Sequence, residues 1–127
     1  MKDVILTEAA PAPFQGAPYS QAIRIGDLVF VSGQLGLAPG DPELVGEGVV
    51  EQTEQIFRNL AAILEAAGSG VDRIVKTTVF LVDLGDFAAM NEVYRHHAGD
   101  APPARSTVQV AALPSGARVE IEAVAHV

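Results

Sequence analysis

The 127-residue sequence contains no cysteine. The chain therefore has no disulfide, no thiolate ligand for zinc and no thiol nucleophile, so its stability must come from packing. It also lacks any uninterrupted apolar run long enough to span a bilayer, and its first residues lead into a short strand-like segment without the apolar core of a signal peptide. We expect a cytoplasmic protein with no membrane partner.

Basic residues are scarce as well. Only 8 Lys and Arg oppose 16 Asp and Glu, which gives a formal net charge of −8, and the basic residues are spread singly from Lys2 to Arg118. The chain therefore offers no basic stripe that could follow a phosphate backbone. We expect no nucleic-acid partner.

The usual motifs for metals and phosphates are missing too. His96 and His97 are adjacent, so on a helix their side chains point about 100° apart and do not form the same-face pair that a metal requires. The glycines between Gly33 and Gly48 match neither the GxxxxGK[ST] pattern nor the GxGxxG pattern of phosphate loops. We expect no metal site, and we interpret these glycines as turn residues.

Apolar residues, in contrast, are abundant. They make up 49% of the chain, and the mean hydropathy is +0.27. The length suits one domain over residues 1–127, because no linker-like composition interrupts it. This apolar content is high for a small soluble monomer, so we expect a homo-oligomer in which copies of the chain cover part of each other's apolar surface.

The periodicity of the apolar residues predicts an α+β fold. The predicted elements are a strand at 4–6, a hairpin with arms at 22–25 and 28–32, a helix at 49–67, a strand at 74–82, a second helix from residue 87, and strands at 105–113 and 118–127. Gly33 is expected to end the hairpin, Gly68 to stop the first helix and Asp86 to cap the second. The order β-ββ-α-β-α-ββ favours a mixed sheet with both helices on one face, and other subunits would cover the other face.

Arg105 is the first candidate for a functional residue. It follows two prolines where a loop becomes a strand, so a stiff backbone holds a guanidinium that can bind a small carboxylate bidentately. A solvated surface arginine is the alternative. If the last two strands formed a plain hairpin, Glu120 would lie roughly 20 Å from Arg105. A site shared by both residues would then need another subunit or a different strand pairing.

Four motifs, in this order, resemble those of the RidA (YjgF) family. They are residues 17–22 (APYSQA), 31–34 (VSGQ), 74–80 (IVKTTVF), and 103–106 (PARS) with 119–122 (VEIE), and the similarity extends from Thr7 to Ala125. The resemblance implies a homotrimer with a chorismate-mutase-like α+β fold and sites in clefts between subunits. It also implies hydrolysis of reactive enamines and imines, such as 2-aminoacrylate and 2-iminopropanoate, to a 2-oxo acid and ammonia without a cofactor.

The resemblance also implies roles for individual residues. The carboxylate-binding arginine of the family falls on Arg105, and its strand glutamate, which is associated with the attacking water, falls on Glu120. Tyr19 would close the pocket and offer a hydroxyl.

Four further positions would contribute to substrate binding, namely Ser32, Gly33, Asn91 and Thr107. Thr107 stands where many family members have cysteine. We nevertheless expect activity, because the backbone at this position can serve under any side chain and hydrolysis of a protonated imine needs no covalent nucleophile.

Alternative functions stay open at this point. A non-catalytic trimer that binds 2-oxo acids as a regulator would use the same residues as an imine deaminase. The ribonuclease or translation-inhibitor activity attributed to some relatives is disfavoured by the net charge of −8 and by the absence of a His/Lys catalytic cluster. The family also includes 2-aminomuconate deaminases, so the motifs leave the side chain of the preferred imine open.

Overall fold

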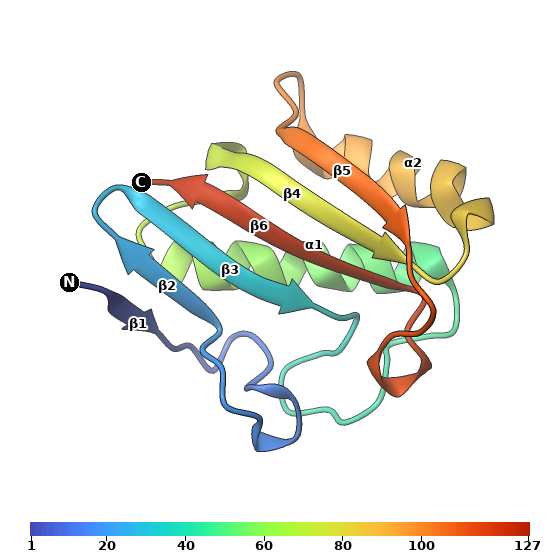
Figure 1. Cartoon of the computed structure of the whole chain (residues 1–127), viewed down its shortest axis with the longest axis horizontal. Coiled ribbons are helices and arrows are strands. Elements are labelled where there is room, and N and C mark those ends of the chain that lie inside the picture. Colours follow the sequence, from blue (N-terminus) through green and yellow to red (C-terminus); the bar gives the residue numbers. More distant parts are fainter.

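Two helices cover one face of a six-stranded mixed sheet in the computed structural model, which describes residues 1–127 (Figure 1). The elements are β1 (Asp3–Ile5), β2 (Ala22–Ile25), β3 (Leu28–Gln34), α1 (Val49–Ala66), β4 (Ile74–Leu81), α2 (Phe87–Ala98), β5 (Ala104–Gln109) and β6 (Val119–His126). This order and the α+β class confirm the sequence prediction. Neither helix combines the length and the apolarity that crossing a membrane requires.

The strands lie in the order β1-β2-β3-β6-β4-β5, and only β4 and β5 run parallel. α2 supplies the crossover that a parallel pair needs. Because β6 inserts between β3 and β4, it forms no hairpin with β5, and the plain hairpin considered from the sequence is wrong. In the observed register Thr77 lies opposite Arg105, whereas Phe80 lies opposite Glu120.

The core lies between the sheet and α1. Ile56, Leu60 and Ile63 recur at helical spacing along α1 and are completely buried. They belong to one cluster with alternate strand residues such as Val79 and Ile121. Burial of each large side chain of this kind stabilises the fold by roughly 1.5–3 kcal/mol, so the sheet is fixed mainly from its helix-covered side.

Several boundaries can be compared with the sequence prediction. Gly68 follows α1 with a φ of +83°, the left-handed conformation of a glycine that ends a helix, as predicted. β3 continues past Gly33 to Gln34, so the predicted strand end at Gly33 is wrong. β5 stops at Gln109 rather than at residue 113, because the chain there leaves the edge of the sheet to reach β6.

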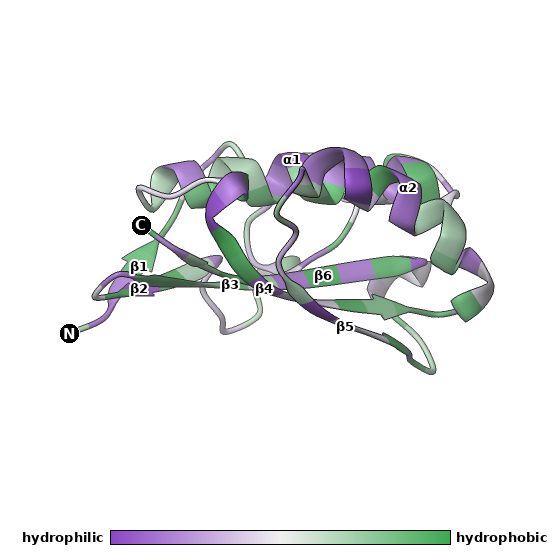
Figure 2. Ribbon diagram, turned by 90° about the horizontal axis from the view of Figure 1, so that it is seen from above, coloured by the Kyte–Doolittle hydropathy of each residue, from purple (hydrophilic) through white to green (hydrophobic).

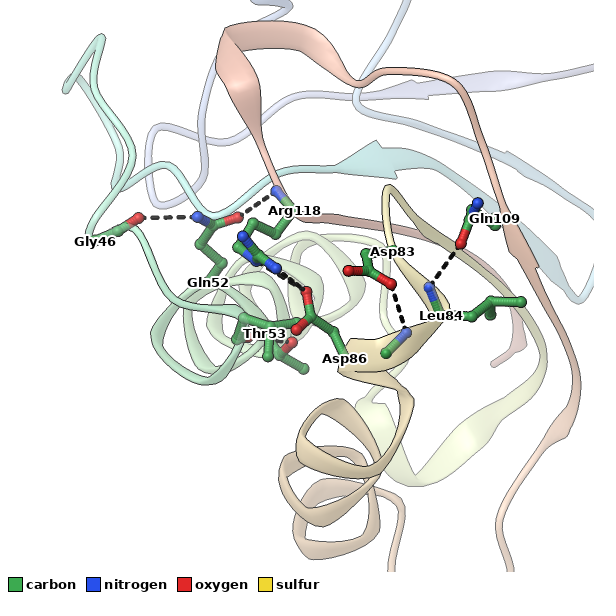
Figure 3. Close-up of polar contacts among 10 residues, drawn as sticks. Gly46, Gln52, Thr53, Asp83, Leu84, Asp86, Gln109 and Arg118 are labelled. Atoms are coloured by element: carbon green, nitrogen blue, oxygen red, sulfur yellow. Dashed lines mark hydrogen bonds and ion pairs between the residues drawn. The ribbon is translucent and has the colours of Figure 1, made fainter.

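Asp86 precedes α2 as predicted, but its carboxylate makes no capping hydrogen bond. Its Oδ2 atom instead accepts from Arg118, at 2.8 Å from Nε and 2.7 Å from Nη2 (Figure 3). Beside this ion pair, the side chain of Gln52 accepts a hydrogen bond from the Arg118 N–H and donates one to the carbonyl of Gly46. These contacts tie the beginnings of α1, α2 and β6 together, just ahead of Glu120.

The face of the sheet away from the helices has no covering layer within the chain (Figure 2). Apolar side chains alternate with the core residues of β2 and β3 and point to this bare face, where Ile25, Leu28 and Phe30 are 42–48% exposed. Exposed apolar side chains grouped on one face are typical of a surface that another chain covers.

Candidate functional site

A cavity of about 620 Å³ opens on the bare face, beside the paired strands β3 and β6. Tyr19, Ser32, Gly33 and Glu120 all line it. Four of the seven residues predicted for the site therefore meet in one place, although they come from three separate parts of the sequence.

A bulge in β3 shapes the polar end of this cavity. Between Val31 and Gln34, β3 advances three residues while its partner β6 advances two. The extra residue interrupts the pairing at Ser32 and Gly33, and bulges are frequent next to active sites. Because Gly33 has no side chain, the Glu120 carboxylate packs directly against its backbone, and a Cβ added there would lie only 2.8 Å from Glu120 Cδ.

Glu120 is half-buried and electrostatically perturbed. Burial raises the pKa of Glu120, and the negative charge of the neighbouring Glu122 raises this pKa further. A carboxylate whose pKa moves toward neutrality is a better general base, because it holds a transferred proton more tightly. The electrostatics of the cavity therefore suit proton transfer at this position.

The outer wall of the cavity is the loop that precedes β2. The hydroxyl oxygen of Tyr19 accepts a hydrogen bond from the Phe14 N–H at 2.5 Å, which leaves the proton of the hydroxyl available. Gln21, which the sequence did not single out, is buried and holds this loop. Its side chain donates to the carbonyls of Thr7 and Pro11 and accepts from the Thr7 N–H. No local pattern could have identified it, since its partners lie ten or more residues away.

Arg105 lies on the other side of the sheet, at the edge strand β5. It lines a hollow of about 310 Å³ together with Asn91 and Tyr94 of α2. The guanidinium carbon Cζ lies 4.7 Å from the ring centre of Tyr94 and 5.5 Å from that of Phe87. None of the ion pairs in the chain includes Arg105, so its N–H donors are free for a ligand.

Asn91 and Thr107 share this helix-covered side. Thr107 follows Arg105 by two residues on β5, so the two side chains point to the same face. The Oδ1 atom of Asn91 and the Oγ1 atom of Thr107 are buried and have no hydrogen-bond partner in the chain. Buried polar atoms are normally paired, so these two oxygens mark places where a further donor would be favourable.

The predicted residues thus form two half-sites rather than one. The bare-face half-site consists of Tyr19, Ser32, Gly33 and Glu120, and the helix-side half-site consists of Arg105, Asn91 and Thr107. Two strand spacings and three residues separate Arg105 from Glu120, which corresponds to about 14 Å between their Cα atoms. Since the side chains also point to opposite faces, a single chain does not bring them to one small molecule.

Of the two adjacent histidines of α2, only His97 packs against another element. His97 pairs with Glu54 of α1 at 2.8 Å and stacks on Phe57, with 4.7 Å between ring centres, whereas His96 is exposed. The chain contains no group of three or more His, Asp or Glu side chains that could hold a metal ion.

Comparison with known proteins covers nearly the whole chain. A family model described as endoribonuclease L-PSP matches residues 7–127. The 2-iminobutanoate/2-iminopropanoate deaminase of Mus musculus is 48% identical over 125 residues, which are 98% of this chain and 91% of the mouse protein. The chloroplastic Reactive Intermediate Deaminase A of Arabidopsis thaliana is 50% identical over 124 residues, which are 98% of this chain and 65% of the plant protein.

A solved structure supports the same likeness in three dimensions. The crystal structure of RidA from an Antarctic Psychrobacter is 47% identical and has a TM-score of 0.93, covering 98% of this chain and 99% of that one. The likeness therefore spans the strands and the helix that carry both half-sites.

Proposed function

Because the chain belongs to the RidA family, whose model bears the description endoribonuclease L-PSP, we propose that it is an imine deaminase. Its substrates are reactive 2-imino acids such as 2-iminopropanoate, the tautomer of 2-aminoacrylate, and its products are a 2-oxo acid and ammonia. The observation that carries the proposal is the chemistry of the two half-sites. One holds a guanidinium without a carboxylate partner, and the other holds a half-buried carboxylate with a raised pKa.

The proposed site requires two chains, because the half-sites lie on opposite faces of the sheet. We place the helix-side half-site of one subunit against the bare-face half-site of the next, in a homotrimer. The exposed apolar side chains of the bare face supply the interface. A contact between two different surfaces of the same chain forms a ring when the rotation between neighbours closes, and the family resemblance favours a ring of three.

In this arrangement Arg105 binds the substrate carboxylate bidentately and fixes the imine carbon over the cavity of the neighbouring subunit. Glu120 takes a proton from a water molecule as its oxygen adds to that carbon, and a carbinolamine forms. When the imine enters protonated, this carbinolamine is neutral. Glu120 returns its proton to the nitrogen and the C–N bond breaks to release ammonia. The hydroxyl passes its own proton to Glu120, from which solvent removes it, as its oxygen becomes the keto group. Tyr19 lines the cavity and offers its free hydroxyl proton for a hydrogen bond within it. No bond to the protein forms, so Thr107 in place of cysteine leaves the reaction possible.

A competition assay tests the activity. An amino-acid oxidase generates the imine in situ, and semicarbazide traps the part that escapes hydrolysis. An active deaminase lowers the trapped fraction in proportion to its concentration. An unchanged trapped fraction, combined with measurable binding of 2-oxobutanoate, would instead establish the regulatory, non-catalytic alternative. A panel of amino acids in the same assay identifies the preferred side chain of the imine.

The shared site has its own test, in which two inactive variants are combined. Arg105→Met chains keep Glu120, and Glu120→Gln chains keep Arg105. If the site lies between subunits, each site takes Arg105 from one chain and Glu120 from its neighbour. After equimolar subunit exchange, both residues are unmutated in about a quarter of the sites. Activity should therefore reappear at about a quarter of the wild-type level. Two variants that stay inactive after verified exchange would place both residues within one chain.

The ribonuclease alternative draws on descriptions such as that of the family model. The net charge of −8 and the eight dispersed basic residues offer no surface for RNA, since nucleic-acid affinity depends on neutralised phosphates.

A further inference from the structure

Two aromatic rings of α2 flank the guanidinium of Arg105. Its Cζ atom lies 4.7 Å from the centre of the Tyr94 ring and 5.5 Å from that of Phe87, both within the range of a cation–π interaction. A guanidinium held against a ring face keeps its N–H donors free at its edge. These are the donors that a carboxylate binds bidentately.

The Tyr94 ring is itself fixed from two sides. Its hydroxyl shares a buried hydrogen bond of 2.6 Å with Thr77 Oγ1, and its ring meets Phe57 edge to face with 5.4 Å between centres. Thr77 is also the residue of β4 that lies directly opposite Arg105 in the parallel pairing. Thr77, Tyr94 and Arg105 therefore each contact the other two, through the strand pairing, the hydrogen bond and the cation–π contact. The guanidinium of Arg105 is the only charged group among them.

Tyr94 is nearly fully buried and stays uncharged. Burial raises the pKa of its hydroxyl above the ordinary value, and this effect outweighs the hydrogen bond with Thr77 and the charge of Arg105, which both lower the pKa. The neutral phenol therefore supports Arg105 without neutralising it. A carboxylate in the same place would form an ion pair and compete with the substrate.

From this geometry we propose that Tyr94, together with Phe87, is a positioning residue that orients Arg105 for the substrate carboxylate. The inference rests on the proposed function, in which Arg105 binds a 2-imino acid. Tyr94 does not touch the reacting atoms. It acts through Arg105, so its contribution concerns substrate capture more than the chemical step.

The test compares Tyr94→Leu, which removes the ring, with Tyr94→Phe, which removes only the hydroxyl. Cation–π interactions of this kind correspond to about two- to thirty-fold in affinity. We therefore expect Tyr94→Leu to raise the KM for the imine and the Kd for 2-oxobutanoate by about two- to thirty-fold, with kcat within about twofold. Tyr94→Phe should show a smaller rise, because the ring remains but is no longer tied to Thr77. Calorimetry measures the Kd, and the trapping assay gives KM and kcat.

Nuclear magnetic resonance gives a readout that a merely structural role would not move. The Arg105 Nε–H proton lies near ring faces, so it should resonate upfield in the wild type and move downfield in Tyr94→Leu. Val93→Ala serves as the matched control, because it removes a buried side chain of α2 without removing a ring. It should lower stability and leave the Arg105 resonance and the Kd in place.

Three outcomes would overturn the proposal. They are an unchanged Kd in folded Tyr94→Leu, an equal rise in Val93→Ala, and an Arg105 resonance that does not move. If Tyr94→Leu does not fold, Phe87→Leu replaces it, since Phe87 is 42% exposed and its loss perturbs the core little. The Arg105 resonance is measured without substrate, so it tests the support by Tyr94 independently of the proposed function. If the deaminase assignment is wrong, the wild type shows neither turnover nor binding of 2-oxobutanoate. If only the support by Tyr94 is wrong, the wild type is active but the resonance does not move in Tyr94→Leu.

Discussion

Replacing Gly33 by alanine tests how Glu120 is positioned. The new Cβ would lie 2.8 Å from Glu120 Cδ and 3.1 Å from Cγ, whereas ordinary contacts begin at 3.4 Å, so the carboxyl carbon must retreat by about 0.6 Å. A misplacement of 1 Å at a catalytic group can cost about 100-fold in rate, so we expect kcat to fall about 10- to 100-fold. Gly33 does not have a positive φ, and the group that must yield is the end of a flexible side chain. The free energy of unfolding should therefore change by less than about 1 kcal/mol.

Gly36→Ala is the matched control for this prediction. Its Cβ would lie 2.7 Å from Gln52 Cα, which is helix backbone and cannot move aside easily. This variant should lower the thermal unfolding midpoint and keep its kcat per folded chain, the reverse of Gly33→Ala. The trapping assay and thermal denaturation followed by circular dichroism measure both quantities. A folded, assembled Gly33→Ala protein with wild-type kcat would refute the argument that this close contact places Glu120 for catalysis.

Four further predictions concern charge, assembly and stability. The raised pKa of Glu120 means that the folded chain binds its proton more tightly than the unfolded chain, so the stability this proton provides is present below the unfolded pKa and lost as pH rises through the folded one. Glu120→Gln should accordingly raise the calorimetric unfolding midpoint at pH 7 but not at pH 4, and Glu122→Gln should shift the acid limb of kcat to lower pH. Phe30→Lys places a charge on the bare face and should yield smaller species in sedimentation velocity together with loss of activity; an intact oligomer would contradict the proposed interface. Arg118→Met removes the partly exposed ion pair with Asp86 and should lower the free energy of unfolding by about 1 kcal/mol in urea titrations. An unchanged midpoint would show that this ion pair does not contribute to stability.

The local elements could be predicted because their signals are local. Helical spacing of apolar residues in α1, the turn at Gly26-Asp27 and the stop at Gly68 each depend on neighbouring residues alone. The half-exposed alternation of β6 is equally local, and the buried Val119 and Ile121 follow it. The order of elements, and with it the α+β class, followed from these signals.

Strand pairing could not be predicted in this way. The insertion of β6 between β3 and β4 joins segments that are far apart in the sequence, and no turn residue encodes it. For the same reason the sequence did not reveal that Arg105 and Glu120 lie on opposite faces, or that Tyr94 supports Arg105. Asp86 shows the limit of a local rule, because a distant arginine takes the carboxylate that was expected to cap the helix.

The extra residue in β3 makes the candidate site depend on whether the number of residues in this strand is odd or even. Before the bulge the odd-numbered residues Val29 and Val31 face the core, whereas after it the even-numbered Gln34 is buried. A substitution changes only the side chain at its own position. Removal of a single residue here would restore strict alternation and turn the end of β3 at Gln34 to the other face. The geometry of the polar end of the cavity therefore depends on the number of residues in β3. It should be changed less by most side-chain substitutions in this strand than by the deletion of one residue.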